Sequence, residues 1–170
     1  MKKIFLTLMV MVAAVAANAQ VWVGGSLGFR TFSEAEGAAT KTTLDIKPEV
    51  GYDLSEDWSI AIALGYSMDK PEEGDAISTI SVNPYARYNV IKAGNCKAFL
   101  DGGFGFESAD EVNDWNIAIK PGIAYSLNEN FCIVGHLGDG LIYRGGDTKS
   151  QNGIALDIFN GVSFGVYYAF

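Results

Sequence analysis

Bulky apolar residues alternate with small or polar residues along most of the chain after residue 20, and no other feature constrains the fold as strongly. In TLDIKPEVGYDL (residues 43–54), every second position from Leu44 to Leu54 is apolar, and the positions between them are charged or glycine. Successive side chains of a β-strand point to opposite faces of its sheet, so the pattern indicates strands with one apolar face. Helical periodicity is missing, and so is an apolar run of about 18 residues. The chain is predicted to be all-β.

The alternating segments are separated by connections of two kinds. Short turns are expected at 55–57, 92–96 and 128–130, and long, polar, mostly acidic connections at 33–42, 69–77, 107–114 and 143–153. The eight strands are expected near 21–32, 43–54, 58–68, 78–91, 97–106, 115–127, 131–142 and 154–170. Short turns at one end and long loops at the other, with an even strand number, are typical of an antiparallel up-and-down transmembrane barrel.

The charged residues indicate which face of the strands points inward. Lys47, Arg87, Asp101 and Lys120 lie on the face of small residues, and a soluble core does not hold such charges without many partners. A barrel in a membrane turns its apolar face to lipid instead, and strands of about 10 residues are long enough to cross. Aromatic residues also flank the short turns, where a membrane interface favours them: Tyr52, Trp58, Tyr88, Tyr125, Phe131 and Tyr168. A soluble lipocalin-like barrel is the alternative.

The first nineteen residues have the pattern of a secretory signal peptide. Lys2 and Lys3 precede an apolar stretch at 4–16, and Ala17-Asn18-Ala19 is a small-x-small cleavage site. Cleavage is expected after Ala19, which leaves one barrel domain at 20–170. Without the two lysines, 12 − 2 = 10 basic residues face 20 acidic ones, a net charge near −10. This balance argues against nucleic acid as a partner.

Three strands share a frame that contains proline: IKPEVGY (46–52), VNPYARY (82–88) and IKPGIAY (119–125). A fourth, VSFGVYY (162–168), has Phe164 at the proline position. Proline has no N–H to donate to a ladder, so Pro48, Pro84 and Pro121 each lose one bond. We expect a local bulge to absorb that loss.

With its signal peptide, its hairpins PEVGYDLSEDW and PGIAYSLNENF and its C-terminal SFGVYYAF, the chain resembles the small outer-membrane β-barrel proteins of Gram-negative bacteria, the eight-stranded OmpA/OmpX type. The resemblance implies an outer-membrane location, contact with outer-membrane lipid and lipopolysaccharide, and a C-terminal strand read by the barrel insertion machinery. Phe164, Val166, Tyr168 and Phe170 match that insertion signal. Because many functions share this architecture, it implies little about activity.

The inward face predicts a network of charged and polar side chains in the lumen. Its members are Arg30, Asp45, Lys47, Glu49, Tyr85, Arg87, Asp101, Lys120, His136 and Asp157. An eight-stranded barrel is only wide enough for its own side chains to fill it, so we expect a salt-bridged, hydrogen-bonded plug. A gated path for small ions through the same network is the alternative.

His136 is the only histidine, and catalysis would require a serine and an acid beside it. Some small barrels of this type modify lipid A with such a pair. Ser81 and Ser163 also face inward, but they are on other strands and the sequence does not bring either to His136. We therefore expect a structural histidine, no enzyme activity and no cofactor. One histidine and two separated cysteines also argue against a dedicated zinc site.

Cys96 and Cys132 lie two strands apart at the short-turn end, in a compartment that favours disulfides. Two strand spacings exceed the reach of a direct disulfide unless a turn folds across the mouth of the barrel. The sequence therefore leaves both a disulfide and two free thiols as alternatives. The acidic segments SEAEG, DKPEEGDA, ESADEVND and GGDTK offer oxygen ligands to divalent cations or to an unknown partner, without the spacing of a calcium motif. We expect a monomer with a structural or interaction role: membrane integrity and surface-loop binding.

Overall fold

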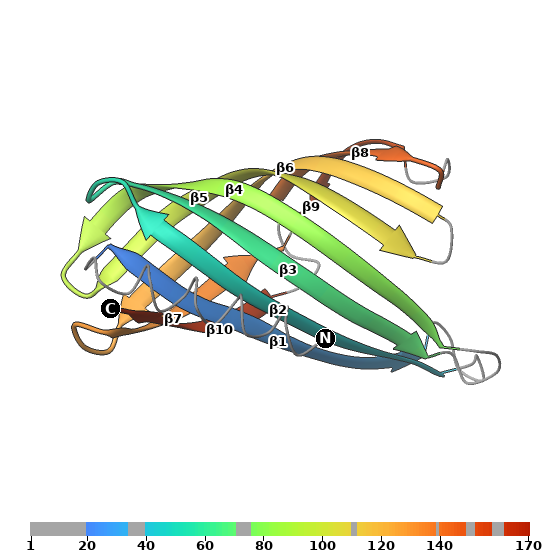
Figure 1. Cartoon of the computed structure of the whole chain (residues 1–170), viewed down its shortest axis with the longest axis horizontal. Coiled ribbons are helices and arrows are strands. Elements are labelled where there is room, and N and C mark those ends of the chain that lie inside the picture. The colour runs from blue at the N-terminus through green and yellow to red at the C-terminus, as the bar shows by residue number, and fades with distance from the viewer. Residues whose placement is uncertain are drawn as a thin grey trace, which may run out of the picture.

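The strands close into an antiparallel β-barrel, which confirms the predicted fold class (Figure 1). The computed structural model describes residues 20–33, 40–70, 76–109, 112–138, 140–148, 152–157 and 162–170. The strands are β1 (Val21–Ser33), β2 (Thr40–Asp53), β3 (Trp58–Lys70), β4 (Ile77–Ala93), β5 (Cys96–Ala109), β6 (Val112–Ser126), β7 (Phe131–Leu137), β8 (Gly140–Gly146), β9 (Gly153–Asp157) and β10 (Val162–Ala169). Across the ranges described, no helix is long and apolar enough to cross a membrane.

The ten segments form the eight strands of the barrel wall, here called staves, because each of the last two staves is divided into two segments. Each strand from β1 to β6 pairs with the next one. β6 pairs with β7 over 122–126 and with β8 over 114–119, so β7 and β8 are two parts of the seventh stave. β10 lies beside β7 and β9 beside β8, and β10 pairs back to β1 to close the ring.

Several strands run further than the sequence pattern predicts. The seventh stave continues to Gly146 rather than ending at 142. β5 continues to Ala109, and β6 already begins at Val112. Backbone pairing does not require apolar side chains, so a ladder can extend past the apolar band with polar residues. The predicted signal peptide and the tips of the acidic loops, at 34–39, 71–75, 110–111 and 149–151, lie outside the described residues.

The proline positions behave differently from the expected bulges. Pairing of β2 with β3 skips Lys47 and Pro48, and pairing of β4 with β5 skips Asn83 and Pro84, with the register unchanged across both gaps. The predicted bulge is therefore wrong at these two prolines, where the missing bond interrupts the ladder without inserting a residue.

At Pro121 the partner stave is broken instead. The β6 pairs change from Gly122↔His136 to Ile119↔Leu141, a shift of two residues between β7 and β8. Gly140 has a φ of 64° and lies so close to Pro121 that an added Cβ would meet the proline ring at 2.8 Å. A shift of two preserves the alternation, so inward residues stay inward along the whole stave.

The barrel has two distinct ends, named here for their connections. At the turn end, Asn128 caps one turn by accepting hydrogen bonds from the amides of Asn130 and Phe131. Aromatic pairs also gather there: Trp58 with Tyr88 and Phe131 with Tyr168, at ring distances of 4.8 and 5.0 Å. The loop end carries the long connections. Towards it, Trp115 lies 6.3 Å from Phe104 and 5.5 Å from Tyr143. Apolar side chains cover the outer wall between these aromatic groups, as expected for a wall in contact with lipid.

Candidate functional site

Among the described residues, the two largest cavities of the lumen have no lining residue in common. The cavity toward the loop end, here the outer cavity, has a volume of about 380 Å³, and the cavity toward the turn end, the inner cavity, about 320 Å³. Asp101 lines the outer cavity and Arg87 the inner one. The two cavities therefore meet at the contact between these two residues.

Arg87 and Asp101 form a buried, two-pronged ion pair. They are cross-strand partners on β4 and β5 and are 6% and 5% exposed. Arg87 donates from Nε to Oδ1 at 2.7 Å and from Nη2 to Oδ2 at 2.8 Å. A fork of this kind fixes the orientation of both groups. Removing one partner of such a pair typically costs about 3–5 kcal/mol, because the other charge is left buried without compensation.

Four aromatic rings surround the Arg87 guanidinium. Its Cζ lies 3.9 Å from the centroid of Phe99 and between 5.4 and 5.6 Å from those of Tyr167, Trp22 and Tyr85. Trp22 and Tyr167 also stack on each other at 4.5 Å. Cation–π contact stabilises a charge that has lost its water. The plug layer is defined here as Arg87, Asp101 and these four rings, Trp22, Tyr85, Phe99 and Tyr167.

Inward-facing glycines make room for the rings of the plug layer. A Cβ built on Gly51 would lie 2.1 Å from the Trp22 ring, one on Gly24 2.0 Å from Tyr167 and one on Gly122 2.3 Å from Phe99. At such separations, any side chain larger than hydrogen would force the ring to move. Each of these glycines is the cross-strand partner of the ring, so the small residues of the inner face let three large rings lie over the neighbouring strand.

Glu49 holds the two tyrosines in position. Its Oε2 accepts hydrogen bonds from the hydroxyl of Tyr85 at 2.6 Å and from that of Tyr167 at 2.7 Å. The carboxylate thus joins β4 and β10 from its own place on β2. Charge-assisted bonds of this type are about twice as strong as neutral ones.

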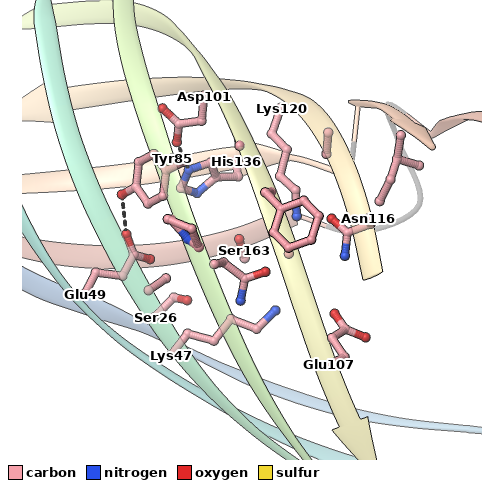
Figure 2. A pocket seen from close by; sticks show the side chains of 18 of the residues that line it. Ser26, Lys47, Glu49, Tyr85, Asp101, Glu107, Asn116, Lys120, His136 and Ser163 are labelled. Carbon is pink, nitrogen blue, oxygen red and sulfur yellow. Dashed lines mark hydrogen bonds and ion pairs between the residues drawn. The ribbon is translucent and has the colours of Figure 1, made fainter. Parts of the chain in front are cut away.

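His136 borders the plug layer on the side of the outer cavity. Its Nε2 lies 2.8 Å from Asp101 Oδ2 and 3.4 Å from Arg87 Nη2, and its ring meets Phe99 edge-on. The side chain is half-buried and lines the outer cavity. Figure 2 shows it beside Asp101 and Tyr85.

The remaining predicted lumen residues lie apart from the plug layer. Lys47 and Lys120 extend into the outer cavity (Figure 2), and Asp45 lines a smaller pocket nearer the loop end. The side chains of Arg30 and Asp157 lie outside the described residues. Of the predicted set, the structure thus brings Glu49 to Tyr85, and Arg87 to Asp101 and His136.

The two cysteines are free thiols in the structure. Cys96 is exposed and pairs with outward-facing Tyr125, whereas Cys132 is half-buried and lines the inner cavity. They point to opposite faces of the wall, so the geometry gives a disulfide no support. Among the described residues, no group of three or more potential metal ligands comes together.

Three rings of the plug layer, Trp22, Phe99 and Tyr167, were not among the sequence-predicted site residues. Each occupies an inward position of the alternation, where its neighbours are small or polar. A bulky aromatic residue on the small-residue face was the signal that would have identified them.

One juxtaposition could not be foreseen from the sequence. Ser163 on β10 is the direct cross-strand partner of His136 on β7, and both line the outer cavity. Ser81 is buried and instead accepts a hydrogen bond from Asn83 at 3.0 Å.

Comparison with known proteins supports the architecture. The family model described as "Outer membrane protein beta-barrel domain" matches residues 4–170. The structure is similar to Neisserial surface protein A, with a TM-score of 0.58 and 12% identity over 90% of this chain and 98% of that one. It is also similar to the N-terminal β-barrel domain of Pseudomonas aeruginosa OprF, with a TM-score of 0.50 and 18% identity over 89% of this chain and 98% of that one. No curated protein matches the chain.

Proposed function

The chain belongs to the outer membrane protein β-barrel domain family, and from that premise we propose that it is a structural and interaction protein of the outer membrane whose lumen is plugged. The buried Arg87–Asp101 pair carries this proposal. Both groups are almost fully buried, the surrounding rings exclude water, and the cavities on either side share no lining residue.

The proposal places the turn end in the periplasm and the loop end at the cell surface, as in bacterial barrels generally. The outer wall then contacts outer-membrane lipid and lipopolysaccharide. The exposed residues Phe164, Val166 and Phe170, with Tyr168 beside them, form the edge that the insertion machinery would read. The acidic loops would meet a partner or divalent cations at the surface.

A second candidate function is a narrow gated ion channel, and one observation favours it. A single layer of side chains separates two polar cavities, so rearrangement of that layer alone would connect them. Asp101 has a second hydrogen-bonding partner in His136, to which it could remain bonded if Arg87 moved away.

Conductance of the purified protein in a planar bilayer distinguishes the two functions. We expect no discrete openings from the wild type, because the plug layer blocks the lumen. We expect openings from the double variant Arg87→Ala/Asp101→Ala, which removes the central pair without leaving an unpaired charge. Lys47→Ala, which removes a cation outside the plug layer, is the matched control and should resemble the wild type. Discrete openings of the wild type that change with these lumen substitutions would contradict the plugged barrel and support the gated channel.

A further inference from the structure

Cationic side chains line the outer cavity from opposite sides of the barrel. Lys47 comes from β2 and Lys120 from β6, the second and the sixth of the eight staves, which lie half the ring apart. Figure 2 shows both side chains reaching from their strands into the cavity. Arg144 on β8, the cross-strand partner of Asn116 on β6, lines the cavity beside Lys120's strand. The cavity therefore presents positive charge on two facing walls.

The carboxylates of the cavity compensate only part of this charge. Of the described residues that line it, three carry a carboxylate, and two of these are bonded to the plug layer. Arg87 donates to both oxygens of Asp101, and two tyrosine hydroxyls donate to Glu49. The third, Glu107, lies toward the loop end, because it also lines the smaller pocket there. This balance favours an anionic ligand.

Part of the cavity wall is apolar, which suits an organic ligand. Ala63, Ala118 and Ile142 line the cavity and are buried. Asn116 and Ser163 add polar groups that can hydrogen-bond a ligand. The volume of about 380 Å³ lies in the range of small-molecule pockets, and an inorganic ion would fill only a small part of it. The lining therefore favours a small organic anion over a simple inorganic one.

The plug layer closes the cavity on the side of the turn end. Two of its members, Tyr85 and Asp101, line the outer cavity, and no described residue lines both this cavity and the inner one. A solute would thus enter from the loop end and leave by the same route. A cavity with one entrance holds a solute rather than conducting it, so its charged lining serves binding.

We propose that the outer cavity binds a small organic dicarboxylate, with one carboxylate at Lys47 and the other at Lys120 and Arg144. Two negative groups are required because the cations face each other across the lumen. A lysine ammonium has three donor hydrogens and an arginine guanidinium five, so each can bind the ligand while keeping a partner in the barrel. This binding goes beyond the proposed function and rests on it only for the closed floor of the cavity.

The test measures the binding of glutarate, a linear dicarboxylate, to the full mature barrel refolded in micelles of an uncharged detergent. Isothermal titration calorimetry at low salt gives the affinity. We expect Lys120→Gln and Lys47→Gln each to weaken the binding about tenfold or more, because each removes a charge-assisted hydrogen bond. Heat-modifiable gel mobility checks that each variant has folded, and the two lysines give independent tests.

Two further substitutions test the sign and the place of the charge. Glu107→Gln removes a carboxylate from the cavity and should tighten the binding. Lys92→Gln is the matched control, because it removes an ammonium at the turn end, where Nζ lies 2.5 Å from Asp57 Oδ1, and it should bind glutarate as the wild type does. Equal weakening by Lys92→Gln and Lys120→Gln would mean that only the net charge of the protein matters, and would overturn the site.

Two esters of glutarate test the class of ligand. Monomethyl glutarate has one carboxylate and should bind at least about tenfold more weakly, and dimethyl glutarate, which has none, should not bind detectably. Monomethyl glutarate or inorganic phosphate that binds as tightly as glutarate would overturn the assignment to a dicarboxylate.

The binding site and the plug can fail separately. Absence of glutarate binding in folded wild-type protein overturns the site and leaves the plugged barrel unchanged. Discrete openings in a planar bilayer from a barrel that binds glutarate, with the dependence on Lys47 and Lys120 given above, would contradict the plug and support the site.

Discussion

The plug layer and the outer cavity hold the same kinds of charged side chains in different surroundings. Arg87 and Asp101 are buried, paired and enclosed by four rings, whereas Lys47 and Glu107 border open space. Two of the rings lie over the glycine that pairs with them on the neighbouring strand, Trp22 over Gly51 and Phe99 over Gly122. The contrast shows that inward charge alone does not produce a closely packed layer: the wall must also leave room for aromatic rings beside the charges.

The largest difference between the two regions should appear when one charge is removed from each. Asp101→Ala leaves Arg87 buried and unpaired, so we expect a loss of about 3–5 kcal/mol in the free energy of unfolding. Glu107→Ala, in the outer cavity, should change it by less than about 0.5 kcal/mol. Urea unfolding in lipid vesicles, followed by tryptophan fluorescence, measures both. Equal effects would mean that the plug layer is as hydrated as the cavity.

A smaller effect is expected from filling the space that glycine leaves. Gly51→Ala places a methyl group against Trp22, and overpacking of this kind costs about 1–3 kcal/mol. Gly102→Ala is the matched control, because a Cβ there meets nothing within 4 Å and the residue is exposed on the outer wall. The same unfolding measurement applies. A neutral Gly51→Ala would show that the ring is free to move away from the wall.

The hydrogen bond between Tyr167 and Glu49 should contribute less again. Tyr167→Phe keeps the ring and removes one hydrogen bond, for an expected loss of about 0.5–1.5 kcal/mol, because Tyr85 still donates to the same carboxylate oxygen. Tyr168→Phe, on the neighbouring outward position, should be close to neutral. If the two variants lose equal stability, the hydroxyl of Tyr167 has no special role in the plug layer.

The smallest effect belongs to the loop end, beyond the apolar band. Hydrogen bonds from Thr148 lower the pKa of the Asp114 carboxyl below its usual value. A lowered pKa means that the stabilisation is present above the unfolded pKa of about 4 and is lost as the pH falls through the folded value. Amide exchange at Thr148 should therefore show weaker protection in acid than at neutral pH, with no such change in Asp114→Asn. Protection independent of pH in both proteins would contradict this assignment.

Much of this architecture follows from the period of two in the sequence. Alternation places Lys47, Arg87 and Asp101 inside and assigns the apolar residues to the outer wall, and the structure has eight staves as predicted. What alternation does not supply is register. Whether His136 faces Ser163 or a neighbour two residues away depends on the register of β7 against β10, which runs unbroken from Phe131↔Tyr168 to Leu137↔Val162. The two-residue shift between β7 and β8, at Gly138 and Gly140 with their positive φ values, is likewise not visible in the alternation. Long-range partners such as Glu49 and Tyr167 also depend on the closure of the ring.

Accessibility of Cys132 tests the central claim, that the plug layer divides the lumen, most directly. This native thiol lines the inner cavity and serves as its reporter once the exposed Cys96 is replaced by serine. In vesicles with the barrel in one orientation, a small, charged, membrane-impermeant thiol reagent is added from either side. We predict that Cys132 reacts from the turn end only, and from both ends after Arg87→Ala/Asp101→Ala. Equal reaction of wild-type Cys132 from both ends would contradict the account, because it would mean that the lumen is continuous.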